Sequence, residues 1–316
     1  MKDRYEREIT YLRLSITELC NLRCRYCMPA EGVPKRTHEE MLSEEEMIRA
    51  VEAAASLGIA KIRITGGEPL VKPNAVSICR RAAATEGIRE VVLTTNGILL
   101  PELAPALREA GVWRINLSLD TLDPDKYARM TRGGRLDQAL AGLRAALEAG
   151  FDRVKVNAVL IGGFNTDEIP ELAELTRRYP VDVRFIELMP MPGNVDFGPE
   201  AYIPGGRVLE ALPAAEPAGE DGVARLYRLP EAQGRIGLIS PLSGHFCGAC
   251  NRLRLTADGH LKPCLHSRDE ISIRGMNREE MREAFLQAIR MKPRQHGALS
   301  ATETSRAARA MNRIGG

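Results

Sequence analysis

The stretch ITYLRLSITELCNLRCRYC, residues 9–27, runs from a strand-like segment directly into a dense group of cysteines. Residues 9–17 are rich in β-branched and apolar side chains, which favours a strand. Cys20, Cys24 and Cys27 follow with the spacing C-x3-C-x2-C. Three thiolates on one short loop can hold three irons of a cubane [4Fe–4S] cluster and leave the fourth iron open to a ligand. Zinc sites typically use paired C-x2-C motifs, so the stretch favours an iron–sulfur cluster at the end of a strand.

Outward from this stretch, strand-like and helix-like segments alternate up to residue 188. The strand-like runs are Ile9–Thr17, Lys61–Thr65, Glu90–Thr95, Arg114–Leu119, Arg153–Ile161 and Val181–Glu187. The helix-like runs are Ser43–Leu57, Ala75–Glu86, Leu99–Ala110, Leu136–Ala149 and Thr166–Arg178. This alternation predicts an α/β fold with a parallel sheet and right-handed crossovers. Such sheets carry their functional residues at the carboxyl ends of the strands.

The character of the chain changes after residue 188, where prolines interrupt a loop-rich stretch. We therefore divide the chain into residues 1–188 and a C-terminal extension, residues 189–316. Within the extension, the stretch Ala214–Gly222 is predicted to be an exposed turn. Strands are predicted over Arg225–Leu229, Arg235–Ile239 and Arg252–Thr256, and a helix over Arg278–Met291.

Composition restricts the class of protein. The 316 residues carry a net charge of only +2, with 44% hydrophobic and 4% aromatic residues, so a basic nucleic-acid-binding stripe is not expected. The sequence contains no run of about 18 apolar residues, so no membrane-spanning helix is predicted. The charged N-terminus has no apolar signal segment, so we expect a cytoplasmic protein. In that reducing compartment seven cysteines favour metal ligation or catalysis over disulfides.

A second set of cysteines lies in the extension, where Cys247, Cys250 and Cys264 form the pattern C-x2-C-x13-C. These three thiols are interpreted as ligands of a second [4Fe–4S] cluster with an open iron. The alternative is a structural zinc site, for which His245, His260 or His266 could supply the fourth ligand. The strand that follows carries Arg252 and Arg254 on one face, an arrangement suited to bidentate contacts with phosphate.

Basic residues also occur inside the predicted parallel strands, at Arg13, Arg63, Lys155 and Arg184. A charge in a buried strand is costly unless it is paired, so an anionic ligand in a polar lumen is one explanation. Pairing with Asp or Glu of the same chain, or an outward orientation, is the other. No phosphate-binding loop of the form G-x4-G-K-[ST] occurs, so a nucleotide would be held in a different way.

The first cysteine motif, together with Thr65-Gly66-Gly67-Glu68-Pro69, resembles the radical S-adenosylmethionine (SAM) superfamily. The resemblance implies a [4Fe–4S] cluster that chelates SAM and reductively cleaves it to a 5′-deoxyadenosyl radical. The residues that match SAM-contacting positions, all near strand ends, are Tyr26, Gly66, Gly67, Glu68, Asn96, Ser118 and Met189.

With the second triad and Cys250-Asn251-Arg252-Leu253-Arg254, the chain resembles one family of that superfamily, which cyclises GTP early in molybdenum cofactor biosynthesis. The resemblance implies an incomplete (β/α)6 barrel of the TIM type, whose C-terminal extension carries the second cluster. The residues matching its GTP-contacting positions are Arg13, Arg63, Thr94, Lys155, Arg184, Arg252 and Arg254. The terminal Gly315 and Gly316 match a tail with a catalytic role.

The family resemblance also implies partners: a flavodoxin- or ferredoxin-type electron donor, a second copy of the chain in a homodimer, and a cyclic pyranopterin monophosphate synthase that takes the product. Two alternatives stay open. Another radical SAM enzyme with an auxiliary cluster would modify a peptide and have no triphosphate site. A non-catalytic zinc or nucleic-acid-binding protein would hold zinc at both triads.

Overall fold

The computed structural model describes residues 1–192, 196–244, 246–297, 299–300 and 303–315. Its core is a run of six neighbouring parallel strands, each paired with the next in sequence order. They are β1 (Tyr11–Ser15), β2 (Lys61–Thr65), β3 (Glu90–Thr95), β4 (Val112–Ser118), β5 (Arg153–Leu160) and β6 (Val181–Glu187). The predicted fold, an incomplete (β/α)6 barrel, is confirmed.

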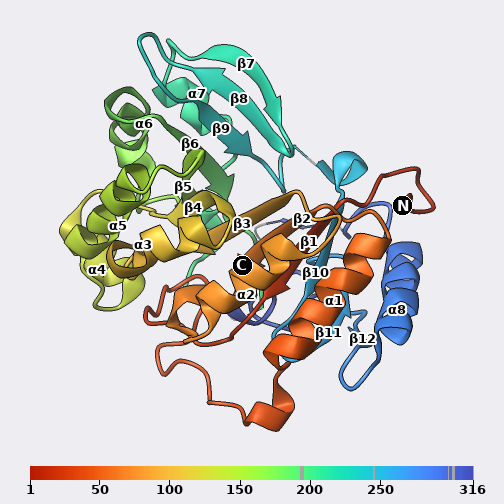
Figure 1. The fold of residues 1–316 in the computed structure, drawn as a ribbon. Coiled ribbons are helices and arrows are strands. Elements are labelled where there is room, and N and C mark those ends of the chain that lie inside the picture. Colours follow the sequence, from red (N-terminus) through yellow and green to blue (C-terminus); the bar gives the residue numbers. More distant parts are fainter. Residues whose placement is uncertain (193–195, 245, 298, 301–302, 316) are drawn as a thin grey trace.

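Helices cover the outer side of these strands (Figure 1). They are α1 (Glu44–Ser56), α2 (Ala75–Ala84), α3 (Leu100–Glu109), α4 (Pro124–Thr131), α5 (Leu136–Glu148) and α6 (Ile169–Arg178). The predicted capping box of α1 is present, because the Ser43 side chain accepts from the Glu46 N–H. Helix α4 was not predicted; its Asp123 cap and Pro124 at the first position are the local signals that could have identified it.

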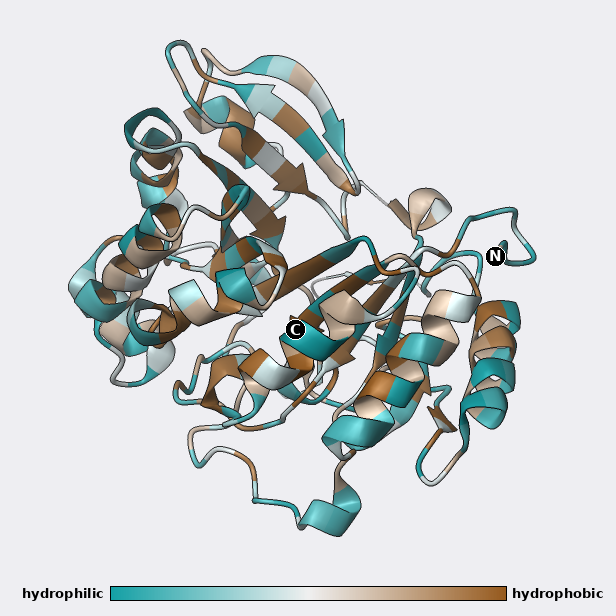
Figure 2. Cartoon of the chain, in the orientation of Figure 1, coloured by the Kyte–Doolittle hydropathy of each residue, from teal (hydrophilic) through white to brown (hydrophobic). Residues whose placement is uncertain are grey.

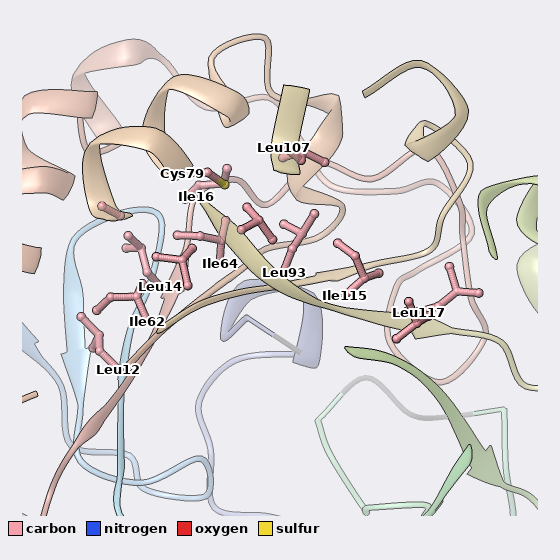
Figure 3. Close-up of a cluster of buried hydrophobic side chains, with 14 of the residues drawn as sticks. Leu12, Leu14, Ile16, Ile62, Ile64, Cys79, Leu93, Leu107, Ile115 and Leu117 are labelled. Carbon is pink, nitrogen blue, oxygen red and sulfur yellow. The ribbon is translucent and has the colours of Figure 1, made fainter. Parts of the chain in front are cut away.

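Alternate residues of the strands face two different environments. Leu12 and Leu14 of β1 pack outward with Ile62 and Ile64 of β2 in the main hydrophobic core (Figure 3). The intervening positions, such as Arg13 and Arg63, line a cavity inside the barrel. Parallel strands are usually apolar on both faces. Their polar inner face therefore indicates a function rather than packing. The outer helices, such as α1, carry both teal and brown residues along their length in Figure 2.

The extension lengthens the sheet at both edges. Strand β9 pairs in parallel with β6, and β10 pairs in parallel with β1, so eight parallel strands enclose the lumen. The elements of the extension are α7 (Arg207–Ala211), β7 (Glu216–Asp221), β8 (Ala224–Arg228), β9 (Ile236–Ile239), β10 (Arg252–Leu255), β11 (His260–Lys262), β12 (Ile271–Ser272) and α8 (Arg278–Met291). The sheet continues from residues 1–188 into the extension. The domain boundary between residues 188 and 189 stays a prediction.

The prediction that Ala214–Gly222 is an exposed turn is wrong. Residues Glu216–Asp221 form β7, which pairs antiparallel with β8. The stretch has few apolar residues because β7 is an edge strand, exposed along most of its length. No helix in the described part of the chain is both long and apolar enough to cross a bilayer.

Candidate active site

One cavity of about 410 Å³ runs through the lumen and is lined by both cysteine triads. The first triad follows β1 at the carboxyl end of the parallel strands. The second precedes β10, whose first residue, Arg252, lies in register with the first residue of β1, Tyr11. The two triads therefore stand at opposite ends of the barrel. This differs from the expectation that functional residues gather at the carboxyl ends alone.

The first triad is held by the backbone that follows β2. The N–H of Gly67 donates to Thr17 O at 2.8 Å, and the N–H of Glu68 donates to Leu19 O at 2.8 Å. A Cβ on Gly67 would lie 2.4 Å from Leu19 O, so only glycine allows this approach. Gly66 is under the same constraint from Thr17 O, at 2.6 Å. The two glycines thus fasten the cysteine loop to β2.

Glu68 links the same loop to the end of β3. Its carboxylate accepts hydrogen bonds from the Asn96 N–H at 2.7 Å, the Leu70 N–H at 3.0 Å and the Thr95 hydroxyl at 2.8 Å. Burial raises the pKa of Glu68 to about 7, although the three hydrogen bonds act to lower it. The Asn96 amide in turn donates to the Asn21 side chain at 2.7 Å. Glu68 and Asn96 both line the cavity and stiffen the first-triad loop.

Tyr26 lies inside the cavity and donates from its hydroxyl to Asp120 Oδ2 at 2.9 Å. The other Asp120 oxygen accepts from the Val159 N–H at 2.8 Å. Burial raises the pKa of Asp120 to about 6, although both hydrogen bonds oppose the shift. Ser118 and Met189 line the same cavity, so the predicted SAM-binding residues are brought together.

A row of guanidiniums crosses the wall between the triads. Arg13 of β1 is in register with Arg63 of β2 on one side and with Arg254 of β10 on the other. Burial, reinforced by these two neighbours, lowers the pKa of Arg13 well below its usual range. Arg63 donates to Thr94 Oγ1 at 3.3 Å. Within the described ranges, neither Arg13 nor Arg63 forms an ion pair with a carboxylate.

Two other predicted substrate residues are paired inside the protein. Lys155 is fully buried, does not line the cavity, and its ammonium contacts Asp221 at the end of β7. Arg184 pairs with the same carboxylate at 2.7 Å. Burial, followed by the charges of Arg184 and Arg114, lowers the pKa of Lys155 to about 7. The internal pairing left open by the sequence is thus realised here, and Asp221 was missed because its strand was interpreted as a turn.

The second triad has cationic neighbours, of which the sequence indicated Arg252 but not Lys292 or Arg7. The Lys292 ammonium lies 3.5 Å from Cys250 Sγ. Arg7, paired with Asp3, donates to Cys247 O at 2.8 Å. Burial acts to raise the pKa of Cys250, but Lys292 and Arg252 outweigh it and lower that pKa. The guanidinium of Arg252 also lies 5.5 Å from the centre of the Phe246 ring.

No three His, Cys, Asp or Glu side chains among the described residues, which leave out His245, converge as ligands of one metal ion. Each thiolate of a cubane cluster binds a different iron, so a cluster does not require three thiols to converge on one metal ion. His266 donates to or accepts from Ser305 Oγ at 2.9 Å and is engaged there.

The C-terminal tail enters the barrel from the side of the first triad. Arg254 Nη1 donates to Gly315 O at 3.3 Å. Gly315 has φ +80°, and a Cβ there would lie 2.8 Å from Thr65 Cγ2. Ion pairs hold the preceding residues, with Arg309 2.6 Å from Asp258 and Arg313 3.2 Å from Glu18. Gly316 lies outside the described residues.

Comparison with known proteins agrees with this geometry. Residues 14–176 match the family described as "Radical SAM superfamily", and residues 181–298 match "Molybdenum Cofactor Synthesis C". The chain is 47% identical to a GTP 3′,8-cyclase of Alkaliphilus oremlandii, over 100% of both chains. It is 48% identical to a GTP 3′,8-cyclase of Pelotomaculum thermopropionicum, again over 100% of both.

Solved structures support the fold alone. Streptococcus suis SuiB bound to S-adenosylmethionine superimposes with a TM-score of 0.64 at 16% identity, covering 84% of this chain. Methylornithine synthase superimposes with a TM-score of 0.53 at 19% identity, covering 65% of this chain. The chain spans 63% and 62% of those two proteins, respectively.

Proposed function

Because the chain belongs to the GTP 3′,8-cyclase family of the radical SAM superfamily, also called molybdenum cofactor biosynthesis protein A, we propose that it converts GTP to (8S)-3′,8-cyclo-7,8-dihydroguanosine 5′-triphosphate. The observation that carries this proposal is the single lumen that has a cysteine triad at each end and a wall of arginines between them. A radical generated at one end can reach a nucleotide anchored at the other without leaving the cavity.

We assign Cys20, Cys24 and Cys27 to a [4Fe–4S] cluster that binds SAM. When bound, this pair supplies the 5′-deoxyadenosyl radical that abstracts hydrogen from C3′ of the ribose. Tyr26, Gly66, Gly67, Ser118 and Met189 hold SAM. Glu68 and Asn96 act mainly by fixing the loop, since the carboxylate of Glu68 is already engaged by three donors.

We propose that Cys247, Cys250 and Cys264 hold a second [4Fe–4S] cluster and that this cluster binds the guanine of GTP. Thiolates are favoured there because Lys292 and Arg252 lower the pKa of Cys250. The three thiols border the same cavity as the first triad. We therefore propose that the guanine binds at the amino end of β1 and β10.

The triphosphate is assigned to the arginine row. Arg13, Arg63, Arg252 and Arg254 supply planar donors that bind phosphate bidentately, and a triphosphate of about four negative charges balances them. Thr94 Oγ1 accepts a hydrogen bond of 3.3 Å from Arg63 Nη1 and so orients the guanidinium. Arg184 lines the cavity and can contact the substrate while paired with Asp221, whereas Lys155, which lies behind the cavity wall, acts by holding the same carboxylate.

The tail is proposed to act in the radical step. Gly315 lies against the ends of β1 and β2, close to the expected position of SAM, and two glycines allow the chain to thread beside a substrate. We assign Gly315 and Gly316 a catalytic role on this basis. The barrel wall around the cavity limits the access of solvent to a radical formed inside it.

The partners follow from the proposed chemistry. An electron donor of the flavodoxin or ferredoxin type is expected to approach from outside, where a second hollow of about 390 Å³ is lined by Cys20, Arg23 and Arg132. Acidic electron carriers suit such basic residues. A homodimer, a cytoplasmic location and transfer of the product to a cyclic pyranopterin monophosphate synthase complete the proposal.

The test is an anaerobic assay of the reconstituted protein with SAM, dithionite and GTP, followed by mass spectrometry of 5′-deoxyadenosine and the nucleotide. We expect both products, and we expect Arg252→Ala to remove the nucleotide product. Deoxyadenosine formed without a GTP product would instead support a peptide substrate. Zinc at both triads, with neither product, would contradict the radical chemistry.

A further inference from the structure

Three lysines are fully buried in this protein, and they differ in what balances their charge. The ammonium of Lys155 contacts Asp221, and that of Lys262 lies 2.8 Å from Glu270. Lys292, with 2% of its surface exposed, forms no ion pair with a carboxylate in the part of the chain that the structure describes. Its partners are two carbonyl oxygens and one sulfur.

Those partners belong to the two segments that carry the second triad. Lys292 Nζ donates to Arg252 O at 2.8 Å and to Pro263 O at 3.0 Å, and it lies 3.5 Å from Cys250 Sγ. Pro263 directly precedes Cys264. One ammonium therefore bridges the Cys250 segment to the Cys264 segment, which are separated by thirteen residues of chain.

The position of Lys292 depends on helix α8. Lys292 is the residue at which α8 ends, and its own N–H bonds to Ile289 O before the chain turns into an extended conformation. The helix packs against α1 and buries Phe285 and Ile289. The packed helix thus fixes the backbone position from which the Lys292 side chain reaches the triad.

A buried cation with only neutral partners is costly, so a countercharge is required. Of the other ionisable groups near the triad, Arg252 and Arg254 are cations, Arg7 is already paired with Asp3, and His296 interacts with the Cys247 thiol. Three thiolates on a cubane core of charge about +2 have a net charge of about −1, which matches one ammonium. We propose that Lys292 is a positioning residue of the second metal centre, bonding the Cys250 thiolate, balancing its charge and joining the two cysteine segments. This inference rests on the proposed second cluster.

The inference predicts a redox property as well as an assembly role. Hydrogen bonds to ligating sulfur and nearby positive charge stabilise the reduced state of an iron–sulfur cluster. Removing the Lys292 ammonium should therefore lower the reduction potential of the second cluster. A lysine that served only to fill space would leave that potential unchanged.

The experiment uses the full chain with Cys20, Cys24 and Cys27 changed to alanine, so that only the second cluster is present. Lys292→Met, Lys292→Gln and Lys292→Arg are compared with Lys262→Met, a buried lysine whose countercharge is a protein carboxylate. The readouts are iron per chain after anaerobic reconstitution and the midpoint potential from a titration followed by electron paramagnetic resonance.

We expect Lys292→Met to retain less than about half of the iron and to show a lower midpoint potential. Lys292→Arg should restore both, and Lys292→Gln, which keeps a donor without the charge, should fall between them. Lys262→Met should keep the potential even if it melts earlier. Full iron and an unchanged potential in both Lys292→Met and Lys292→Gln would overturn the inference. If the unmodified chain did not convert GTP, that result would contradict the proposed function, independently of these readouts.

Discussion

The two cysteine triads line one cavity but are built in different ways. The first occupies eight consecutive residues, and backbone hydrogen bonds from Gly67 and Glu68 hold it in place. The second is assembled from two separate segments, and side chains from distant parts of the chain, Arg7 and Lys292, fasten it. Both sets of cysteines can be recognised in the sequence by their spacing, whereas the distant side chains that fasten the second set, Arg7 and Lys292, cannot.

The largest expected effect distinguishes the two triads, because each is needed for a different set of products. We expect Cys24→Ala to abolish both 5′-deoxyadenosine and the cyclised nucleotide, since the cleavage of SAM depends on the first triad. Cys264→Ala should remove only the nucleotide, by about a thousandfold, and leave uncoupled deoxyadenosine formation. Quantifying both products in one anaerobic reaction checks this, and cyclised nucleotide made by Cys264→Ala would refute a substrate role for the second triad.

Arg13 lies in the wall between the triads. We expect its charge to strengthen GTP binding and to lower the free energy of unfolding. Its guanidinium is buried beside Arg63 and Arg254, so Arg13→Met should weaken GTP binding about 10- to 100-fold. The same change should raise the free energy of unfolding by about 1 kcal/mol, because it removes a desolvated cation. Isothermal titration and urea denaturation measure the two effects. A loss of stability without a loss of affinity would show that Arg13 is structural.

The tail at the first-triad end can be tested at one glycine. In Gly315→Ala the positive φ and the 2.8 Å approach to Thr65 Cγ2 should displace the tail, and the nucleotide product should fall about tenfold. Deoxyadenosine formation should persist. Gly275→Ala is the control, because Gly275 also has positive φ, +70°, but a Cβ added there would meet no atom within 4 Å. Equal losses in the two variants would argue against a role for the tail.

The smallest expected effect is one on stability and concerns Glu68, which stiffens the first-triad loop. Its pKa is raised from 4.5 to about 7, so its contribution to stability is present below pH 4.5 and is lost as the pH rises through 7. Glu68→Gln should flatten the dependence of the urea midpoint on pH between 5 and 7.5 in the metal-free protein. The exposed Glu86→Gln should leave that dependence as it is, and an unflattened curve in Glu68→Gln would assign the slope to another group.

Much of the barrel was predictable because its signals are local. The limits of β2, β3, β6 and α8 agree with the predicted ones, since periodicity, caps and C-terminal glycines define those segments. Strand β7 was missed because an exposed edge strand has no apolar alternation to reveal it. The functions assigned to individual site residues stay predictions, while their gathering in one cavity is a property of the structure.

By itself the sequence determined the α/β alternation, the two cysteine triads and the basic strand positions, because each depends on residue type and short spacing. Only the tertiary structure decided that the triads lie at opposite ends of one lumen, that Asp221 pairs with Lys155 and Arg184, and that Lys292 reaches Cys250. These relations join residues far apart in the chain. The physical reason is that such contacts are specified by the strand order of the sheet and the packing of α8, which no local pattern records.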